Sequence, residues 1–99
     1  YAHEMRTHLF GPLGIDPKKT HIPNGMAQDL EGEAKRYEAF VRANPPDVWI
    51  VGVGVEGHIA FNESGSNRDS ITRVVKLAPS TLEANKGFYG GDSARRLNS

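Results

Sequence analysis

A run of apolar residues that leads into a glycine-rich segment constrains this chain more than any other feature. Residues 48–55 are mostly apolar and rich in valine, and two prolines at 45–46 precede them. A run of this kind is typical of a buried strand in a parallel sheet. Gly52, Gly54 and Gly57 stand at its carboxyl end, where glycines let a backbone approach a ligand closely. Ligands usually bind at that end of the strands in an α/β sheet, so we expect the functional site there.

The segments before this run predict a strand followed by a helix. Residues 20–23 are a short strand candidate. Asp29 is a candidate helix N-cap. Apolar residues then recur along one face of the helix that follows it, namely Leu30, Ala34, Tyr37, Phe40 and Val41. The order strand, helix, strand predicts a right-handed crossover onto a parallel sheet, and hence an α/β fold.

Three further elements are expected at the two ends of the chain. Residues 1–10 have the pattern of an amphipathic helix, and residues 72–77 are another strand candidate. Ser80 has Glu83 three residues later, which predicts a capping box at the start of a helix. Gly87 is expected to end that helix.

Composition excludes several classes of function. The 99 residues include twelve basic and twelve acidic side chains and no cysteine. Disulfides, thiolate catalysis and cysteine zinc sites are therefore excluded, and nothing suggests a nucleic-acid or membrane partner. No apolar run approaches the roughly 18 residues of a membrane span, and no signal-peptide pattern opens the chain. We expect a soluble, cytoplasmic protein.

Residues 52–57 match the dinucleotide-binding pattern G-x-G-x-x-G. That pattern should open directly into a long helix, and an acidic residue should follow about 20 positions later. Asn62, Ser64 and Gly65 leave room for barely two helical turns, and the region around Lys76 lacks the acidic residue. The sequence therefore disfavours a dinucleotide site.

Two carboxylates flank a histidine directly after the glycines. Glu56 and His58 are two residues apart, so an extended backbone would point both side chains the same way. Glu63 is five residues further on and could fold back toward the histidine. A carboxylate beside an imidazole fixes its tautomer, which suits general acid–base chemistry. The competing interpretation is a loop histidine with two solvated glutamates. A metal site on His58 and Glu63 lacks a second nearby histidine.

From Gly52 to Glu63 the chain reads Gly-Val-Gly-Val-Glu-Gly-His-Ile-Ala-Phe-Asn-Glu. This segment closely resembles the active-site signature of the glucosamine-6-phosphate deaminase (isomerase) family. The resemblance extends to residues 24–31, 35–38, 72–73 and 81–85. The related 6-phosphogluconolactonases also carry Gly-His here but continue differently. The resemblance implies a Rossmann-like three-layer α/β/α fold with a parallel sheet.

The resemblance also implies an activity and roles for the three flanking side chains. The family converts glucosamine 6-phosphate and water into fructose 6-phosphate and ammonia, without a metal or organic cofactor. His58 matches the histidine that moves the proton during opening of the sugar ring, and Glu63 matches the acid that orients it. Glu56 stands where the family usually has Asp. The glycines, Gly52, Gly54 and Gly57, would leave room for the sugar phosphate.

The chain departs from the family at its phosphate-binding positions. Gly87 replaces the Arg that would grip the substrate phosphate, so Lys86 is the candidate substitute. Ser66 and Arg73 match an allosteric phosphate site, but Val75 replaces its Lys. Lys76 would lie on the opposite side of a strand, so family-style activation is not predicted.

Residues 1–99 are expected to be a single incomplete domain, an internal segment of a deaminase-like domain that would be inactive alone. The family's enolisation base would precede this segment, and its members range from monomers to hexamers, which leaves a homo-oligomer open. Two alternatives remain: a 6-phosphogluconolactonase-like hydrolase, in which His58 would activate water, and a non-catalytic sugar-phosphate-binding homologue.

Overall fold

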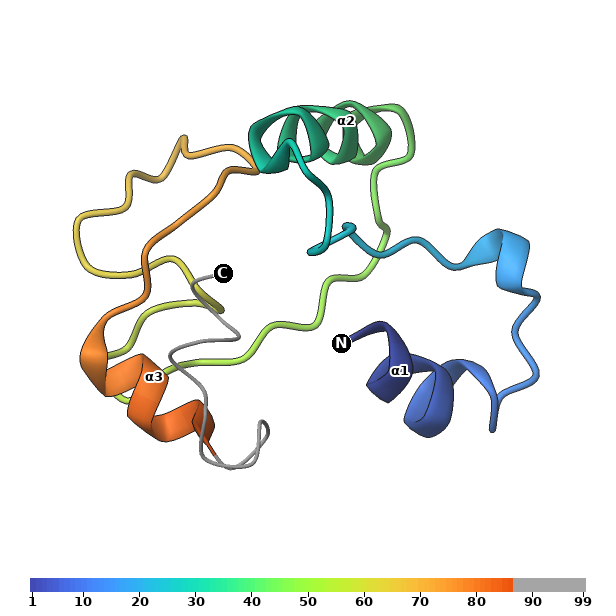
Figure 1. Ribbon diagram of the computed structural model, residues 1–99, viewed down its shortest axis with the longest axis horizontal. Helices are drawn as coiled ribbons and strands as arrows, with labels where there is room; N and C mark the ends of the chain where they lie inside the picture. The colour runs from blue at the N-terminus through green and yellow to red at the C-terminus, as the bar shows by residue number, and fades with distance from the viewer. Residues whose placement is uncertain (87–99) are drawn as a thin grey trace.

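The computed structural model describes residues 1–86, and the expected helix end at Gly87 lies outside them. Figure 1 shows helical elements joined by long extended connections. They are the α-helix α1 (Ala2–Met5), the π-helix η1 (Arg6–Phe10), the 3-10 helix η2 (Pro17–Lys19), and the α-helices α2 (Leu30–Ala43) and α3 (Pro79–Asn85). No helix among residues 1–86 is both long and apolar enough to cross a membrane.

The predicted N-terminal helix is confirmed as α1 continuing into η1. The second half is wound more widely, since the backbone N–H of Gly11 donates to the carbonyl of Arg6, five residues earlier, at 2.8 Å. A Cβ on Gly11 would lie 2.6 Å from that carbonyl oxygen. Glycine is therefore the residue that lets this wide turn close.

Helix α2 begins where the sequence predicts. Asp29 is its N-cap, and the carboxylate accepts a hydrogen bond from the N–H of Gly32 at 2.9 Å. A Cβ on Gly32 would lie only 2.3 Å from the other carboxylate oxygen, so this glycine makes room for the cap. On the apolar face Ala34 is buried, and the rings of Phe40 and His21 lie 4.2 Å apart.

The three predicted strands are not strands in this structure. Residues 20–23, 48–55 and 72–77 carry no ladder, and the one bridge among residues 1–86 is an isolated antiparallel pair, Val53 with Ile59. A strand exists only where a second backbone pairs with it. No backbone hydrogen bond joins residues 48–51 to another described segment. Trp49 and Ile50 are accordingly 75% and 92% exposed. The parallel sheet and its crossover are therefore not present in residues 1–86.

Helix α3 begins two residues earlier than predicted, and the capping box is wrong. Ala78 is the N-cap without a side-chain hydrogen bond, and Pro79 is the first helical residue. The fixed φ of proline is already suited to that position. The Ser80 hydroxyl donates instead to the Glu56 carboxylate at 3.0 Å. Leu77 and Thr81, on either side of this helix start, are buried.

Candidate active site

The glycine-rich segment doubles back on itself in a tight turn. The N–H of Gly54 donates to the His58 carbonyl, and the N–H of Ala60 donates to the Gly52 carbonyl, each at 2.8 Å. Gly57 has a φ of +81°, a left-handed conformation that glycine adopts without steric cost. The extended backbone expected between Glu56 and His58 is therefore wrong, because the chain must reverse between Gly54 and His58.

This turn fixes the His58 ring. Its Nδ1 lies 2.8 Å from the Ala60 carbonyl oxygen, and its Nε2 lies 3.7 Å from Glu63 Oε2. A carbonyl can only accept, so Nδ1 carries a proton and donates it. Only 10% of the His58 side chain and 14% of the Glu63 side chain are exposed. The structure thus brings together two of the three predicted catalytic residues in a sheltered pair.

Gly54 lies directly against the imidazole. A Cβ on Gly54 would stand 2.2 Å from Nε2 of His58, well inside van der Waals contact. Around Gly52 and Gly57, by contrast, no described atom lies within 4 Å of such a Cβ. The sequence suggested that the glycines clear space for a ligand, and the structure adds that Gly54 clears space for the histidine. Substrate contacts of all three glycines remain a prediction.

Several groups of helix α3 surround the Glu63 carboxylate. The Ala78 N–H donates to Glu63 Oε1 at 3.1 Å. The buried Thr81 hydroxyl is the largest influence that lowers the pKa of Glu63, although Oγ1 lies outside regular hydrogen-bond geometry. The Ala78 N–H and the charge on His58 lower the pKa further, while burial opposes them. Glu63 is therefore ionised at neutral pH and faces His58 as an anion.

Glu56 has a hydrogen-bond partner outside this pair. Its Oε1 accepts the hydrogen bond from Ser80 Oγ, at an exposed position. Lys86, the candidate phosphate ligand, pairs with Glu83 on the exposed side of α3. The sequence missed Ser80 and Thr81 as neighbours of the site. The Ser80–Glu83 spacing predicts only a helix cap, and the contact of Ser80 with Glu56 joins residues 24 apart in the sequence.

The structure brings together Arg73 and Ser66, the two residues that match an allosteric phosphate site in the sequence. Arg73 Nη2 donates to Ser66 Oγ at 2.8 Å, and Nη1 donates to Asn62 Oδ1 at 3.2 Å. A cavity of about 330 Å³ adjoins them and extends to Glu63 and Lys76. Because residues 73–78 do not form a strand, the expectation that Lys76 lies on the opposite side is wrong. Lys76 lines the same cavity as Arg73.

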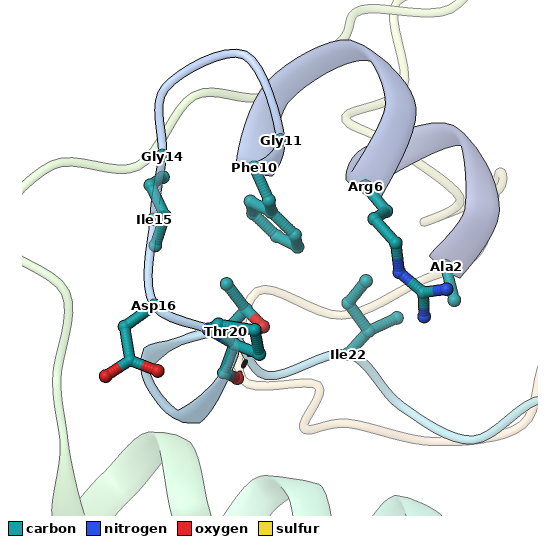
Figure 2. Close-up of a pocket in the computed structure, with 10 residues that line it drawn as sticks. Ala2, Arg6, Phe10, Gly11, Gly14, Ile15, Asp16, Thr20 and Ile22 are labelled. Atoms are coloured by element: carbon teal, nitrogen blue, oxygen red, sulfur yellow. Dashed lines mark hydrogen bonds between the residues drawn. The ribbon is translucent and has the colours of Figure 1, made fainter.

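A larger cavity lies elsewhere. It has a volume of about 560 Å³, and Arg6 and Phe10 of η1 line it together with Ile15 and Ile22. Figure 2 shows these four side chains around the cavity. None of the predicted site residues lines it. Among residues 1–86 no three histidine, aspartate or glutamate side chains are grouped to hold a metal ion. The sheltered His58–Glu63 pair is therefore the candidate active site.

The structure is similar to a solved protein and the sequence is similar to curated proteins, although no family model matches the chain. The structure matches that of a monomeric glucosamine-6-phosphate deaminase, described as a missing link of the NagB superfamily, with a TM-score of 0.82 and 40% identity. The match covers 85% of this chain and 35% of that chain. The chain thus has the fold of a segment of a NagB-superfamily protein.

Sequence comparison gives the more particular assignment. The chain is 51% identical over 96 residues to glucosamine-6-phosphate deaminase 1 of Giardia intestinalis. It is 49% identical over 89 residues to the deaminase of Streptococcus agalactiae, and 48% identical over 93 residues to deaminase 2 of Bacillus subtilis. These matches cover 96%, 90% and 93% of this chain. The chain is a homologue of the glucosamine-6-phosphate deaminases, and it spans 36–37% of the length of these relatives.

Proposed function

We propose that the protein carrying this chain is an amino-sugar-phosphate isomerase and deaminase, which converts glucosamine 6-phosphate and water into fructose 6-phosphate and ammonia. The observation that carries the proposal is the His58–Glu63 pair, at 3.7 Å and mostly shielded from solvent. It occurs in a chain about half identical to named deaminases. A cytoplasmic location belongs to the same proposal.

In this proposal His58 moves the proton that opens the sugar ring. Nδ1 is occupied by the Ala60 carbonyl, so Nε2 is the nitrogen that takes the proton of the C1 hydroxyl and returns it to the ring oxygen. The ionised Glu63 faces Nε2 and stabilises the imidazolium that exists between these two transfers. Because Gly54 contacts the ring, the imidazole is held in place while the proton moves.

The remaining site residues are assigned supporting roles. Glu56 would contribute a second carboxylate, and Gly52, Gly54 and Gly57 would allow close approach of the sugar. Lys86 would contact the phosphate after leaving Glu83. Ser66 and Arg73 would hold a second phosphate at the cavity beside Glu63. Residues 48–53 would join a parallel sheet in the full-length protein, which would cover the exposed Trp49 and Ile50.

The test is ammonia release from glucosamine 6-phosphate by the full-length protein. His58→Ala should lower kcat by at least 100-fold, because general acid–base catalysis supplies about 10²–10⁴-fold. His3→Ala, on the exposed N-terminal helix, is the matched control and should retain wild-type turnover. Full activity in His58→Ala would rule out the role assigned to that ring.

A second candidate is a sugar-phosphate-binding homologue without turnover. It is favoured by Glu56, whose side chain is one methylene longer than that of the Asp usual in the family that the sequence resembles. Saturable binding of glucosamine 6-phosphate without ammonia release would support this alternative. Hydrolysis of 6-phosphogluconolactone without deamination would instead indicate a lactonase.

A further inference from the structure

The Glu56 carboxylate has one hydrogen-bond partner among the described residues. Ser80 Oγ, in the first turn of α3, donates to Glu56 Oε1 at 3.0 Å across 24 residues of sequence. Both side chains are exposed, so neither needs this bond for burial. Glu56 itself lies in a turn that includes the left-handed Gly57. The contact therefore ties this turn to α3.

The hydrogen bond between Ser80 and Glu56 depends on the length of the Glu56 side chain. Glu56 and Asp differ by one methylene group, or about 1.5 Å of reach. With Asp at this position the carboxylate oxygen would retreat to about 4.5 Å from the Ser80 hydroxyl, which is outside hydrogen-bond range. The bond to Ser80 therefore requires glutamate rather than aspartate at position 56.

The same turn of α3 also holds the other carboxylate. Ala78 donates its N–H to Glu63, and Thr81 lowers the pKa of Glu63. Ser80 lies between these two residues in sequence. A single helical turn thus contacts both acidic side chains that flank His58, and a displacement of α3 would move the two together.

We propose that Ser80 is a positioning residue, which holds the Glu56 carboxylate and thereby fixes the turn that carries His58 against α3. This inference rests on the proposed deaminase function. Ser80 does not touch the reacting atoms, and it acts only through Glu56.

The kinetic test compares Ser80→Ala with Ser80→Thr in the full-length protein. Loss of the hydroxyl should lower kcat about fivefold with KM unchanged, the factor that corresponds to one ordinary hydrogen bond. Threonine keeps the hydroxyl and should restore kcat. Thr7→Ala removes an exposed hydroxyl from η1 and serves as the matched control.

A double-mutant cycle separates positioning from a general structural effect. In a Glu56→Asp background the carboxylate no longer reaches residue 80, so Ser80→Ala should cause no further loss of kcat. An equal fivefold loss in both backgrounds would overturn the proposal.

Amide hydrogen exchange tests the same contact without any activity. The Gly57 N–H, which donates to Gly54 at 2.9 Å, should exchange about fivefold faster in Ser80→Ala and at the wild-type rate in Ser80→Thr. If the wild-type protein releases no ammonia, the proposed function fails while this measurement still decides the role of Ser80. Identical exchange in wild type and Ser80→Ala would overturn that role.

Discussion

Glu38 on α2 accepts two hydrogen bonds from Thr72, which lies 34 residues further along the chain. The Thr72 hydroxyl donates at 2.6 Å and its backbone N–H at 2.9 Å, both to Glu38 Oε2. These bonds, the hydroxyl first, hold the pKa of Glu38 at about 2, and Arg42 contributes less. Thr72 is followed by Arg73, which contacts Asn62 and Ser66. The pair therefore connects α2 to the loop that carries Glu63.

Glu38→Gln should destabilise the protein at neutral pH. Thr72 donates to one oxygen of the carboxylate and Arg42 donates to the other, so the amide must turn its NH2 group toward one of these donors. The pKa of Glu38 is depressed from 4.5 to about 2 in the folded state. Its contribution to stability is therefore complete above about pH 4.5 and is lost as the pH falls toward 2. Thermal unfolding between pH 7 and pH 2 should show a smaller acid-induced decrease in Tm for the variant than for wild type.

Glu31→Gln is the matched control for this measurement. It removes an exposed charge from the first turn of the same helix, and no hydrogen bond to another described side chain is lost with it. An acid-induced decrease in Tm as large in Glu38→Gln as in wild type would contradict the role of the Thr72 contact.

Gly54→Ala should inactivate the site while leaving the fold intact. The new Cβ would stand 2.2 Å from His58 Nε2, so the imidazole must move away. A displacement of about 1 Å in a catalytic group can cost 10²-fold in rate, and we expect a loss of about that size in kcat. Gly25→Ala is the control, since no described atom lies within 4 Å of its Cβ. Equal activity in the two variants would show that the ring does not occupy this place during turnover.

Ala60→Gly should stabilise the folded protein by about 1 kcal/mol, because a left-handed alanine is strained and glycine is not. Ala60 has a φ of +50°, and its carbonyl accepts the hydrogen bond from His58 Nδ1. The strain therefore lies in the residue that orients the ring. Urea unfolding compared with wild type measures the change. A decrease in the free energy of unfolding would contradict this account.

Local signals in the sequence predicted the helices well and the long-range contacts poorly. Asp29 has the chemistry of an N-cap, and the apolar spacing after it specifies one helix face, so α2 could be located from neighbouring residues alone. The strand expected at residues 48–55 needs a pairing partner, and among the described residues only its end, around Val53, has one. The apolar run before it therefore stays exposed. The contacts of Ser80 with Glu56 and of Thr72 with Glu38 span 24 and 34 residues. Neither leaves a periodic pattern in the sequence.

Within the site, the sequence predicted which residues gather but not how they are held. Motif and charge pointed to His58 and Glu63, and the structure places them side by side. The Ala60 carbonyl reaches the His58 ring because Ala60 has a left-handed φ. Alanine seldom adopts this backbone conformation. The reversal at Gly57 turns Glu56 toward α3. Both effects depend on backbone conformation in a turn, which side-chain chemistry does not specify.

Thr81→Val should raise the pKa of Glu63 toward the ordinary glutamate value of 4.5. The Thr81 hydroxyl is the largest cause of the lowered pKa of Glu63, ahead of the Ala78 N–H and the His58 charge. Valine keeps the shape of the buried side chain and removes the hydroxyl, while Thr81→Ser keeps the hydroxyl. A carbon-13 NMR titration of the Glu63 carboxyl should therefore give an upward shift in Thr81→Val and a smaller one in Thr81→Ser.

Thr81→Val should also change how the stability of the protein depends on pH. A carboxyl with a depressed folded-state pKa stabilises the protein above its unfolded pKa, and this contribution disappears as the pH falls through the folded value. Thr81→Val should therefore lose stability at a higher pH than wild type during acid titration. If the Glu63 titration is the same in wild type and Thr81→Val, the Ala78 N–H and His58 are sufficient to hold the carboxylate in its ionised form, and α3 contributes to the site through its backbone alone.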